Sequence, residues 1–226
     1  DTGLAPVLEA AGDALMAAGS PGGGQPAIDL GCAVGRGTWA LAARTGGPVV
    51  GADLNFSMLS LAQKLAVDGQ IIWPRRRLGI VYDPVLATLP ENAAKLPVDF
   101  WAMDAMALPF RAGQFAGATA VNLVDCIPGP TNLIAEMARV LVADAPAVLT
   151  TPYDWSPTVA EPAAWMGGHS QRGPGGGAAE PVLTETLRGY GFEPIAEERD
   201  LEWRLSLHER SVMHYRLHMV ACRRAA

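Results

Sequence analysis

The chain has 226 residues, and hydrophobic side chains make up 50% of it against 18% for charged ones. This balance supports a sizeable buried core and argues against disorder. The formal net charge is −6, and an acidic surface repels phosphate backbones, so nucleic acid is not expected as a partner. No internal repeat is visible, and we expect a single domain over residues 1–226.

Cysteine usage and hydropathy narrow the expected cellular location and the expected partners. The three cysteines lie far apart, at Cys32, Cys126 and Cys222, and form no CxxC pair. This favours reduced thiols in a cytoplasmic protein over disulfides or a zinc site, and the spacing of the histidines suggests no metal site either. No apolar run is long enough to span a bilayer, and the first residues lack the basic stretch of a signal peptide, so no membrane partner is expected. The oligomeric state stays open.

Helical and strand-like segments alternate along the first hundred residues. Periodicity predicts helices over 4–18, 37–44 and 56–67, and short apolar runs predict strands over 27–30 and 48–53. A Gly- and Pro-rich break over 20–24 separates the first helix from the first strand. The less regular stretch is predicted to be an insertion over about 68–96, with strand-like pieces at 71–73 and 78–82.

The second half of the chain continues this alternation. The predicted strands cover 98–102, 115–121 and 147–151, the predicted helices cover 131–142 and 183–190, and a final antiparallel pair of strands covers roughly 193–207 and 211–223. The stretch of about 152–180 is rich in Pro, Gly and aromatic residues and is predicted to be a long functional loop. The alternation implies an α/β fold whose parallel sheet is covered by helices on both faces.

The strongest local motif is the run Asp29-Leu30-Gly31-Cys32-Ala33-Val34-Gly35-Arg36-Gly37, which follows a predicted strand and opens a predicted helix. Glycines in such a turn let the backbone approach a ligand closely. Ligands of doubly wound sheets bind beyond the carboxyl ends of the strands. Here the acid precedes the glycines, whereas in the dinucleotide-binding G-x-G-x-x-G turn the glycines come first. A purely structural turn is the alternative.

Polar residues also follow the next three predicted strands of the sheet. Asp53 ends the second strand, 24 residues after Asp29, a spacing at which an acid accepts hydrogen bonds from ribose hydroxyls. Asp104 follows the third strand, and the nearby Met106 is expected to supply an apolar wall to the binding site. Asp125, in Asn122-Leu123-Val124-Asp125 after the fourth strand, is expected either to orient an amine or imidazole of a substrate or to cap the next turn. Solvated or turn-forming aspartates are the alternatives for the first two acids.

In their order at four successive strand ends, these motifs resemble those of class I S-adenosylmethionine (SAM)-dependent methyltransferases. The resemblance implies a Rossmann-like fold, with a seven-stranded, mostly parallel sheet that has an antiparallel strand near the C-terminus. It also implies SAM as the cofactor. The residues that it places around the cofactor lie on the turns after the four strands: Asp29, Gly31, Cys32, Ala33, Gly35, Arg36, Asp53, Leu54, Ser57, Asp104, Ala105, Met106, Asn122 and Leu123.

From about residue 25 onward, the chain is also similar to a narrower family, the C-terminal mercaptohistidine N-methyltransferase domain of ovothiol synthases. The similarity is carried by the first and fourth turns and by three later stretches: Thr151-Pro152-Tyr153-Asp154-Trp155, Trp165-Met166-Gly167-Gly168, and the ending from Asp200 through Arg210. It implies a small-molecule substrate, methylated on the ring nitrogen of a thiol-histidine. Ser206 and Leu207 stand where that family has an Arg-Glu pair, so the substrate can differ here.

The catalytic candidates that follow from these resemblances are Asp125, Tyr153, Trp165 and Arg210. Tyr153 and Trp165, with Trp155, are expected to form an aromatic wall of the kind that holds flat rings and cations, or else to pack the loop onto the sheet. Three other functions stay open: a nicotinamide-dependent oxidoreductase, a non-enzymatic SAM-binding partner or sensor, and a nucleic-acid methyltransferase. The acid-before-glycine order disfavours the first of these, and the acidic charge disfavours the last.

Overall fold

The computed structural model of the chain describes residues 3–21 and 24–226. Of the predicted break over 20–24, Gly22 and Gly23 lie outside the described residues. In the described part, no helix combines the length and the apolar character needed to cross a membrane.

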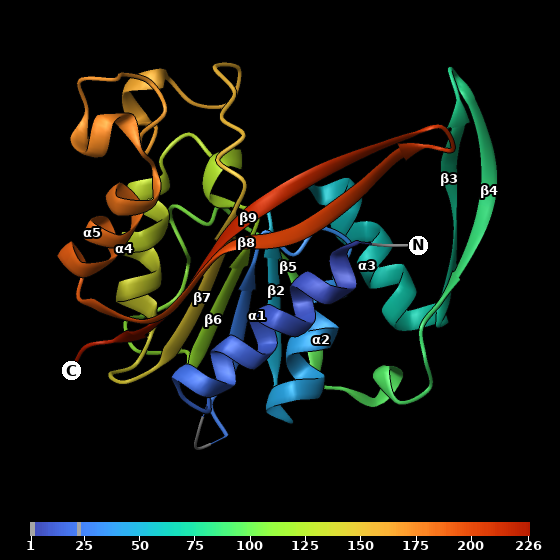
Figure 1. Cartoon of the computed structure of the whole chain (residues 1–226). Coiled ribbons are helices and arrows are strands. Elements are labelled where there is room, and N and C mark those ends of the chain that lie inside the picture. The colour runs from blue at the N-terminus through green and yellow to red at the C-terminus, as the bar shows by residue number, and fades with distance from the viewer. Residues whose placement is uncertain (1–2, 22–23) are drawn as a thin grey trace.

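A seven-stranded sheet forms the centre of the structure, in the order β5-β2-β1-β6-β7-β9-β8 (Figure 1). All neighbouring pairs from β5 to β7 are parallel, and β9 runs antiparallel to both β7 and β8. The predicted mostly parallel sheet with an antiparallel strand near the C-terminus is therefore confirmed. The strands of this sheet are β1 Ala27–Leu30, β2 Val49–Asp53, β5 Val98–Ala102, β6 Gly117–Val121, β7 Pro146–Thr151, β8 Phe192–His208 and β9 Ser211–Arg224.

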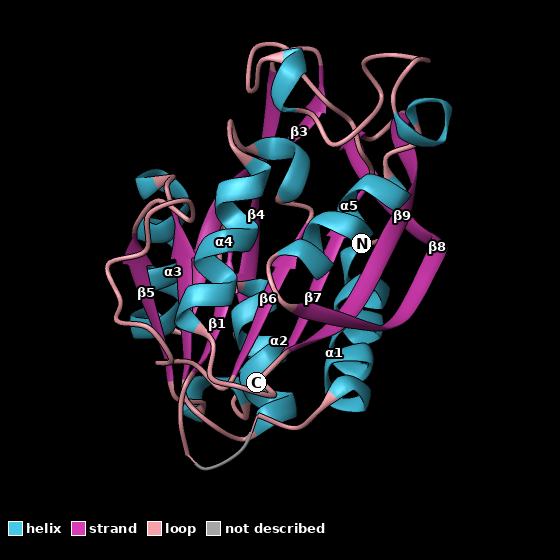
Figure 2. Cartoon of the chain, turned by 90° about the vertical axis from the view of Figure 1, so that its left-hand side faces the viewer, coloured by secondary structure: helices cyan, strands magenta, loops and turns pink. Residues whose placement is uncertain are grey.

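Helices cover both faces of the sheet (Figures 1 and 2). On one face lie α1 Leu4–Ala18 and α2 Arg36–Thr45, on the other lie α4 Pro130–Val140 and α5 Glu180–Gly189, and α3 Phe56–Asp68 packs beside β5. Since every residue of β1 and β7 is buried, these strands are covered on both sides, as their continuous apolar runs predicted. This two-sided burial leaves only the strand ends free to present polar groups.

Local sequence explains where the helices begin and end. The Asn55 side chain accepts a hydrogen bond from the Met58 N–H at 3.2 Å and so caps the start of α3. Gly69, at φ +70°, ends the same helix in the left-handed conformation. Pro130 at the first turn of α4 needs no N–H partner. The predicted helices are confirmed with shifts of up to three residues at their ends.

The insertion predicted over 68–96 is a separate two-stranded hairpin of β3 Gln70–Leu78 and β4 Val81–Thr88. The prediction of a strand over 78–82 is wrong, because that run straddles the hairpin turn at Gly79, which has φ +55°. The long β8–β9 hairpin reaches across to this insertion (Figure 1), where the Glu209 N–H donates to the Arg77 carbonyl at 3.2 Å. The two hairpins thus meet away from the central sheet.

Candidate active site

The glycine-rich turn after β1 is held against the end of β2. The N–H groups of Gly31 and Cys32 both donate to the Ala52 carbonyl, at 2.8 and 3.1 Å. Gly31 and Gly35 have φ values of +72° and +87°, and Ala33 between them has φ +51°. These left-handed values fold the chain back so that α2 starts immediately beyond the turn.

Asp29 lies beneath this turn rather than on its open side. Its carboxylate accepts hydrogen bonds from the hydroxyls of Thr38 and Thr119, both at 2.8 Å, and the residue is only 3% exposed. Burial raises the pKa of Asp29 to about 6 despite these two hydrogen bonds. The carboxylate therefore ties β1 to α2 and β6. Its contribution to the cofactor site stays a prediction, and in this geometry it acts by holding the turn.

Asp53 lies beside the turn, at the end of β2. One carboxylate oxygen accepts from the Ala33 N–H and the other from the Asn55 N–H, both at 2.8 Å. The residue is partly exposed, and each oxygen keeps a further lone pair for a ligand. Next to it, Leu54 is 75% exposed. An acceptor thus adjoins an uncovered apolar side chain at the edge of the sheet.

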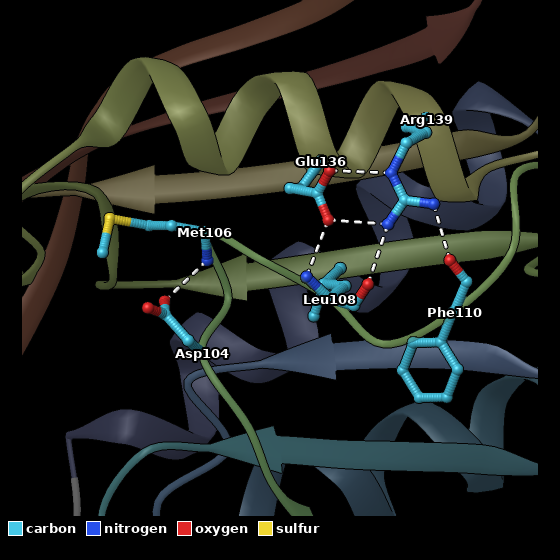
Figure 3. Close-up of polar contacts among 6 residues, drawn as sticks. All are labelled: Asp104, Met106, Leu108, Phe110, Glu136 and Arg139. Carbon is cyan, nitrogen blue, oxygen red and sulfur yellow. Dashed lines mark hydrogen bonds and ion pairs between the residues drawn. The ribbon is translucent and has the colours of Figure 1, made fainter.

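Asp104 lies on the neighbouring loop, which begins where β5 ends. The Met103 N–H donates to the Asp53 carbonyl at 3.0 Å, which places the two acid-bearing loops side by side. One Asp104 carboxylate oxygen accepts from the Met106 N–H at 2.8 Å (Figure 3). The half-buried Met106 side chain extends from the same loop.

Two residues of α4, Glu136 and Arg139, hold the far end of this loop (Figure 3). The Glu136 carboxylate accepts from the Leu108 N–H at 2.7 Å, and the Arg139 guanidinium donates to the carbonyls of Leu108 and Phe110 at 2.9 and 2.6 Å. The two side chains also pair with each other at 2.7 Å. Sequence reasoning missed both residues, because their i,i+3 spacing indicates only a helix surface pair.

The loop after β6 completes the cofactor side of the edge. Asn122, at φ +53°, donates from its N–H to the Thr150 carbonyl at 2.9 Å, and its side-chain oxygen accepts from the Thr150 hydroxyl at 2.7 Å. Leu123 packs against Gly31, where an added Cβ would approach the Leu123 side chain to 2.9 Å. The predicted residues of the first and fourth turns therefore touch one another.

Asp125 is buried at the start of the substrate side. Its two carboxylate oxygens accept from the Thr151 hydroxyl at 2.9 Å and from the Asp154 N–H at 2.8 Å. Burial raises the pKa of Asp125 above its usual range. The carboxylate thus fixes the beginning of the loop that follows β7, which resembles the capping alternative considered for it. Its catalytic role stays a prediction.

The three aromatic side chains for which the sequence left open a ligand-holding wall or packing of the loop, Tyr153, Trp155 and Trp165, lie side by side in this loop, and Tyr153 and Trp155 also pack on the core. We call these three side chains the aromatic wall, and its role in binding a ligand stays a prediction. The ring centroids of Tyr153 and Trp155 lie 6.3 Å apart, and those of Trp155 and Trp165 lie 6.0 Å apart with planes at 9°. His218 of β9 extends the series, with its ring 5.8 Å from that of Tyr153. The buried indole N–H of Trp155 has no hydrogen-bond partner among the described residues, which leaves a donor within the wall.

Arg210 stands apart from the other catalytic candidates. It lies exposed in the turn of the β8–β9 hairpin, where its N–H donates to His208 Nδ1 at 3.3 Å. Figure 1 shows this tip on the side of the β3–β4 hairpin, opposite the loop that carries Tyr153 and Trp165. The structure therefore brings Asp125, Tyr153 and Trp165 to one region but not Arg210.

The remaining predicted cofactor residues are distributed unevenly. Leu54 and Ser57 are exposed on the loop and first turn after β2, and Ala105 is half-buried beside Asp104. Cys32 is buried in the turn, while Arg36 is exposed and lines a shallow groove on the side of α1. Arg36 therefore points toward α1, and its predicted contact with the cofactor receives no support from this orientation.

A cavity of about 530 Å³ adjoins the same edge of the sheet, between α3 and β5. Phe56, at the start of α3, and Ala102, at the end of β5, form its border nearest the acid-bearing loops. Among the described residues, its lining includes neither Asp53 nor Asp104, so this hollow flanks the candidate cofactor site.

The residues at this edge fit an adenosyl group. Asp53 and Asp104 offer carboxylate oxygens to the donors of such a group, its ribose hydroxyls and adenine amino group. Leu54, Met106 and Leu123 offer apolar surface to the ring. The sheet and the residues at its edge therefore place the chain in a class of α/β proteins. Members of this class bind a nucleoside-containing cofactor at the carboxyl ends of their strands.

Comparison with known proteins identifies the family within this class. The family model of the methyltransferase domain matches residues 28–149, which is more than half of the chain. The chain therefore belongs to the methyltransferase-domain family and is a SAM-dependent methyltransferase, with S-adenosylmethionine as its cofactor. Membership in this family excludes the alternative function of a nicotinamide-dependent oxidoreductase. A search of curated proteins found no match.

Solved structures share the fold at low sequence identity. Geranyl diphosphate methyltransferase in complex with SAM has a TM-score of 0.63 and 15% identity, covering 97% of this chain and 84% of its own. The N-methyltransferase NodS from Bradyrhizobium japonicum has a TM-score of 0.60 and 12% identity, covering 97% and 95%. The [4+2]-cyclase SpnF has a TM-score of 0.63 and 17% identity, covering 97% and 81%. These likenesses show the fold alone.

Proposed function

We propose that this methyltransferase acts on a small molecule, and that its methyl acceptor is the ring nitrogen of a thiol-histidine. The observation that carries the proposal is the row of neighbouring rings of Trp165, Trp155, Tyr153 and His218 at the substrate end of the sheet, in which the Trp155–Trp165 and Tyr153–His218 pairs are stacked and the Tyr153–Trp155 pair is tilted by 38°. Flat electron-rich faces hold flat heteroaromatic rings and the cations that form when such rings are alkylated. The resemblance to mercaptohistidine N-methyltransferases points to the same acceptor.

The charge of the chain supports a small acceptor over a nucleic acid. The formal net charge of −6 disfavours a nucleic-acid substrate. The basic run Arg75-Arg76-Arg77, the one local exception, lies exposed on β3 of the insertion, where Arg77 pairs with Asp83 at 3.3 Å. The wall itself lies in a loop that packs on the core through Tyr153 and Trp155. Together with its aromatic faces, these features favour an uncharged or cationic ring over a polyanion.

The residues at the edge of the sheet would have different roles, depending on whether they lie at the cofactor or the substrate side. Asp53 and Asp104 would bind the adenosyl part of the cofactor, and Leu123 would pack near its reactive end. When bound, SAM supplies an activated methyl group. The aromatic wall would hold the acceptor ring in line, and such orientation contributes roughly 7–11 kcal/mol of barrier lowering in favourable cases. An imidazole with a pKa near ~6.5 is largely neutral at neutral pH, so its nitrogen attacks without a strong base.

The test is a methyl-transfer assay with the purified chain. SAM is combined with 4-mercaptohistidine and, separately, with histidine and imidazole, and the products are followed by mass spectrometry. We expect a gain of one methyl group on the mercaptohistidine ring nitrogen and little or none on the other two. Trp165→Leu should reduce this product strongly and leave SAM binding within about twofold. Methylation of none of the three, with SAM bound, would overturn the proposed acceptor but not the family.

A further inference from the structure

A chain of hydrogen bonds leads from the aromatic wall into the β8–β9 hairpin. The Tyr153 hydroxyl lies 2.6 Å from Nδ1 of His218, and Nε2 of His218 lies 2.8 Å from a carboxylate oxygen of Glu197. Arg199 donates to the same Glu197 oxygen at 3.0 Å. His218 is 3% exposed. Three separate elements, the loop after β7 and the strands β9 and β8, therefore supply one connected polar network.

The donor and acceptor chemistry of these side chains determines which group donates each hydrogen bond of the network. Burial alone would raise the pKa of Glu197, but hydrogen bonds from Arg199 and His218 hold it below its usual range, so the group is a carboxylate. A carboxylate only accepts, so His218 must donate from Nε2. Neutral His218 then has its lone pair on Nδ1 and must accept there, which makes the Tyr153 hydroxyl the donor. The remaining lone pairs of the Tyr153 oxygen stay available as acceptors.

We propose that His218 and Glu197 are positioning residues that orient the Tyr153 hydroxyl to accept a hydrogen bond from an N–H or O–H of the methyl acceptor and then take up its proton. The inference rests on the proposed function. Tyr153 would be the catalytic residue that touches the acceptor, and the other two act through it. For an imidazole, accepting from the ring N–H leaves the lone pair on the opposite nitrogen, so the network would also select which nitrogen is methylated.

The proton and electron pairs balance along this path. The acceptor nitrogen forms its bond to the methyl carbon as the carbon–sulfur bond breaks, and the electron pair of that bond stays on sulfur. The methylated ring, now cationic, loses its N–H proton to the Tyr153 oxygen, while the Tyr153 proton passes to Nδ1 of His218. The resulting imidazolium is paired with the Glu197 carboxylate at 2.8 Å. Release of that proton to solvent restores the starting state.

The backbone at Tyr153 and the neighbouring charges agree with this role. Tyr153 has φ +55°, a strained value for a residue with a side chain, and its N–H is held by the Thr151 hydroxyl at 3.0 Å. Burial and the nearby carboxylates, Glu180 first among them, raise the pKa of Tyr153, so it acts as a phenol. Asp125, the other carboxylate near Tyr153, is buried and holds the Thr151 hydroxyl and the Asp154 N–H, so it fixes the loop that carries Tyr153.

The first experiment reads the network without a substrate. In ¹⁵N NMR of the full chain with labelled histidine, at neutral pH, we expect His218 in the Nε2–H form with an unprotonated Nδ1, identified by the loss of its signals in His218→Gln. Glu197→Gln should shift this tautomer balance. A His218 that carries its proton on Nδ1 overturns the proposal whatever the acceptor proves to be, since Tyr153 would then accept from His218.

The second experiment measures turnover with SAM and 4-mercaptohistidine. We expect Tyr153→Phe and His218→Gln each to lower kcat at least tenfold, with the SAM dissociation constant by calorimetry changed less than twofold. His214→Gln, an exposed histidine on the same strand, is the matched control and should leave kcat unchanged. If His218→Gln does not fold, Glu197→Gln carries the comparison.

The outcomes separate the two proposals. Unaltered kcat in both His218→Gln and Glu197→Gln overturns the network while leaving the proposed acceptor intact. If the wild-type chain does not methylate 4-mercaptohistidine, the proposed acceptor fails, and the NMR tautomer still decides whether the network has the required direction.

Discussion

The main-chain N–H of Ala33 donates to a carboxylate oxygen of Asp53 at 2.8 Å, across a separation of twenty residues in the sequence. The glycine-rich turn after β1 and the acid that ends β2 are therefore one structural unit. Because the second Asp53 oxygen accepts from Asn55 at the cap of α3, this carboxylate also fixes the direction in which α3 leaves the sheet. A single side chain thus shapes the two loops on which the cofactor should lie.

The first prediction concerns this carboxylate. Asp53→Ala should raise the SAM dissociation constant about tenfold or more, since losing a charged hydrogen-bond partner costs roughly 1.5–3 kcal/mol. Isothermal calorimetry of the purified chain gives the value directly. Glu91→Ala, which removes an exposed acid from the insertion, is the control and should bind SAM as the wild type does. Equal affinities for Asp53→Ala and the control would contradict the placement of the cofactor.

The second prediction concerns Arg139 and the loop that carries Asp104. Arg139→Met keeps an unbranched apolar side chain but removes the hydrogen bonds to the Leu108 and Phe110 carbonyls (Figure 3). Because the Arg139 side chain is 36% exposed, we expect a loss of only about 1–2 kcal/mol in the free energy of unfolding. The loosened loop should also raise the SAM dissociation constant about threefold to tenfold.

A matched control exists in another helix. Glu185 and Arg188 of α5 form an ion pair with the same i,i+3 spacing, but both side chains are more than half exposed. Arg188→Met should therefore leave SAM affinity unaltered and change stability little. Denaturant unfolding measures the stability of both variants, and calorimetry measures their SAM affinity. If Arg139→Met loses stability but binds SAM normally, the clamp does not position the cofactor loop.

Sequence reasoning found what is local and missed what depends on tertiary contact. Asp53 and Asp104 could be predicted because an acid at or just beyond the carboxyl end of a parallel strand must lie at that edge of the sheet, whatever surrounds it. Glu136 and Arg139 hold residues about thirty positions away, and His218 pairs with Tyr153 across sixty-five, so no spacing rule connects them. Such pairings exist only once the sheet has formed.

Two further differences have equally physical causes. All four residues of β1 are buried, so its sequence has no alternation to indicate which face Asp29 takes, and the carboxylate lies inward under the turn. In the insertion, Leu78 to Tyr82 is mostly apolar and resembles a strand, yet Gly79 allows the left-handed turn that divides it. Continuous apolar runs predict burial or a strand but not the position of a turn within them.

The third prediction follows from the burial of Asp29. Its pKa is raised from 3.8 to about 6 in the folded protein, so folding favours the protonated form. The stabilisation from that proton is fully present below pH 4 and is lost as the pH rises through 6. The unfolding free energy of the wild type relative to Asp29→Asn should therefore fall by on the order of 3 kcal/mol between pH 4 and pH 7.5.

Chemical denaturation of both proteins across this range provides the measurement, and groups common to both cancel in the difference. A difference that stays flat would mean that Asp29 titrates normally in the fold. A difference that grows with pH would mean that the hydrogen bonds from Thr38 and Thr119 outweigh the effect of burial.

The last prediction separates two costs at Gly31. Gly31 and Gly46 have similar φ values, +72° and +66°, but an added Cβ at Gly31 would meet the Leu123 side chain at 2.9 Å, whereas at Gly46 nothing lies within 4 Å. Gly46→Ala should cost about 1–2 kcal/mol for the left-handed backbone alone. Gly31→Ala should cost at least about 1 kcal/mol more, because Leu123 must move in a packed site. It should also weaken SAM binding, since Leu123 belongs to the predicted cofactor site. Equal unfolding free energies and unaltered SAM affinity in the two variants would show that the contact between the first and fourth turns does not matter for binding.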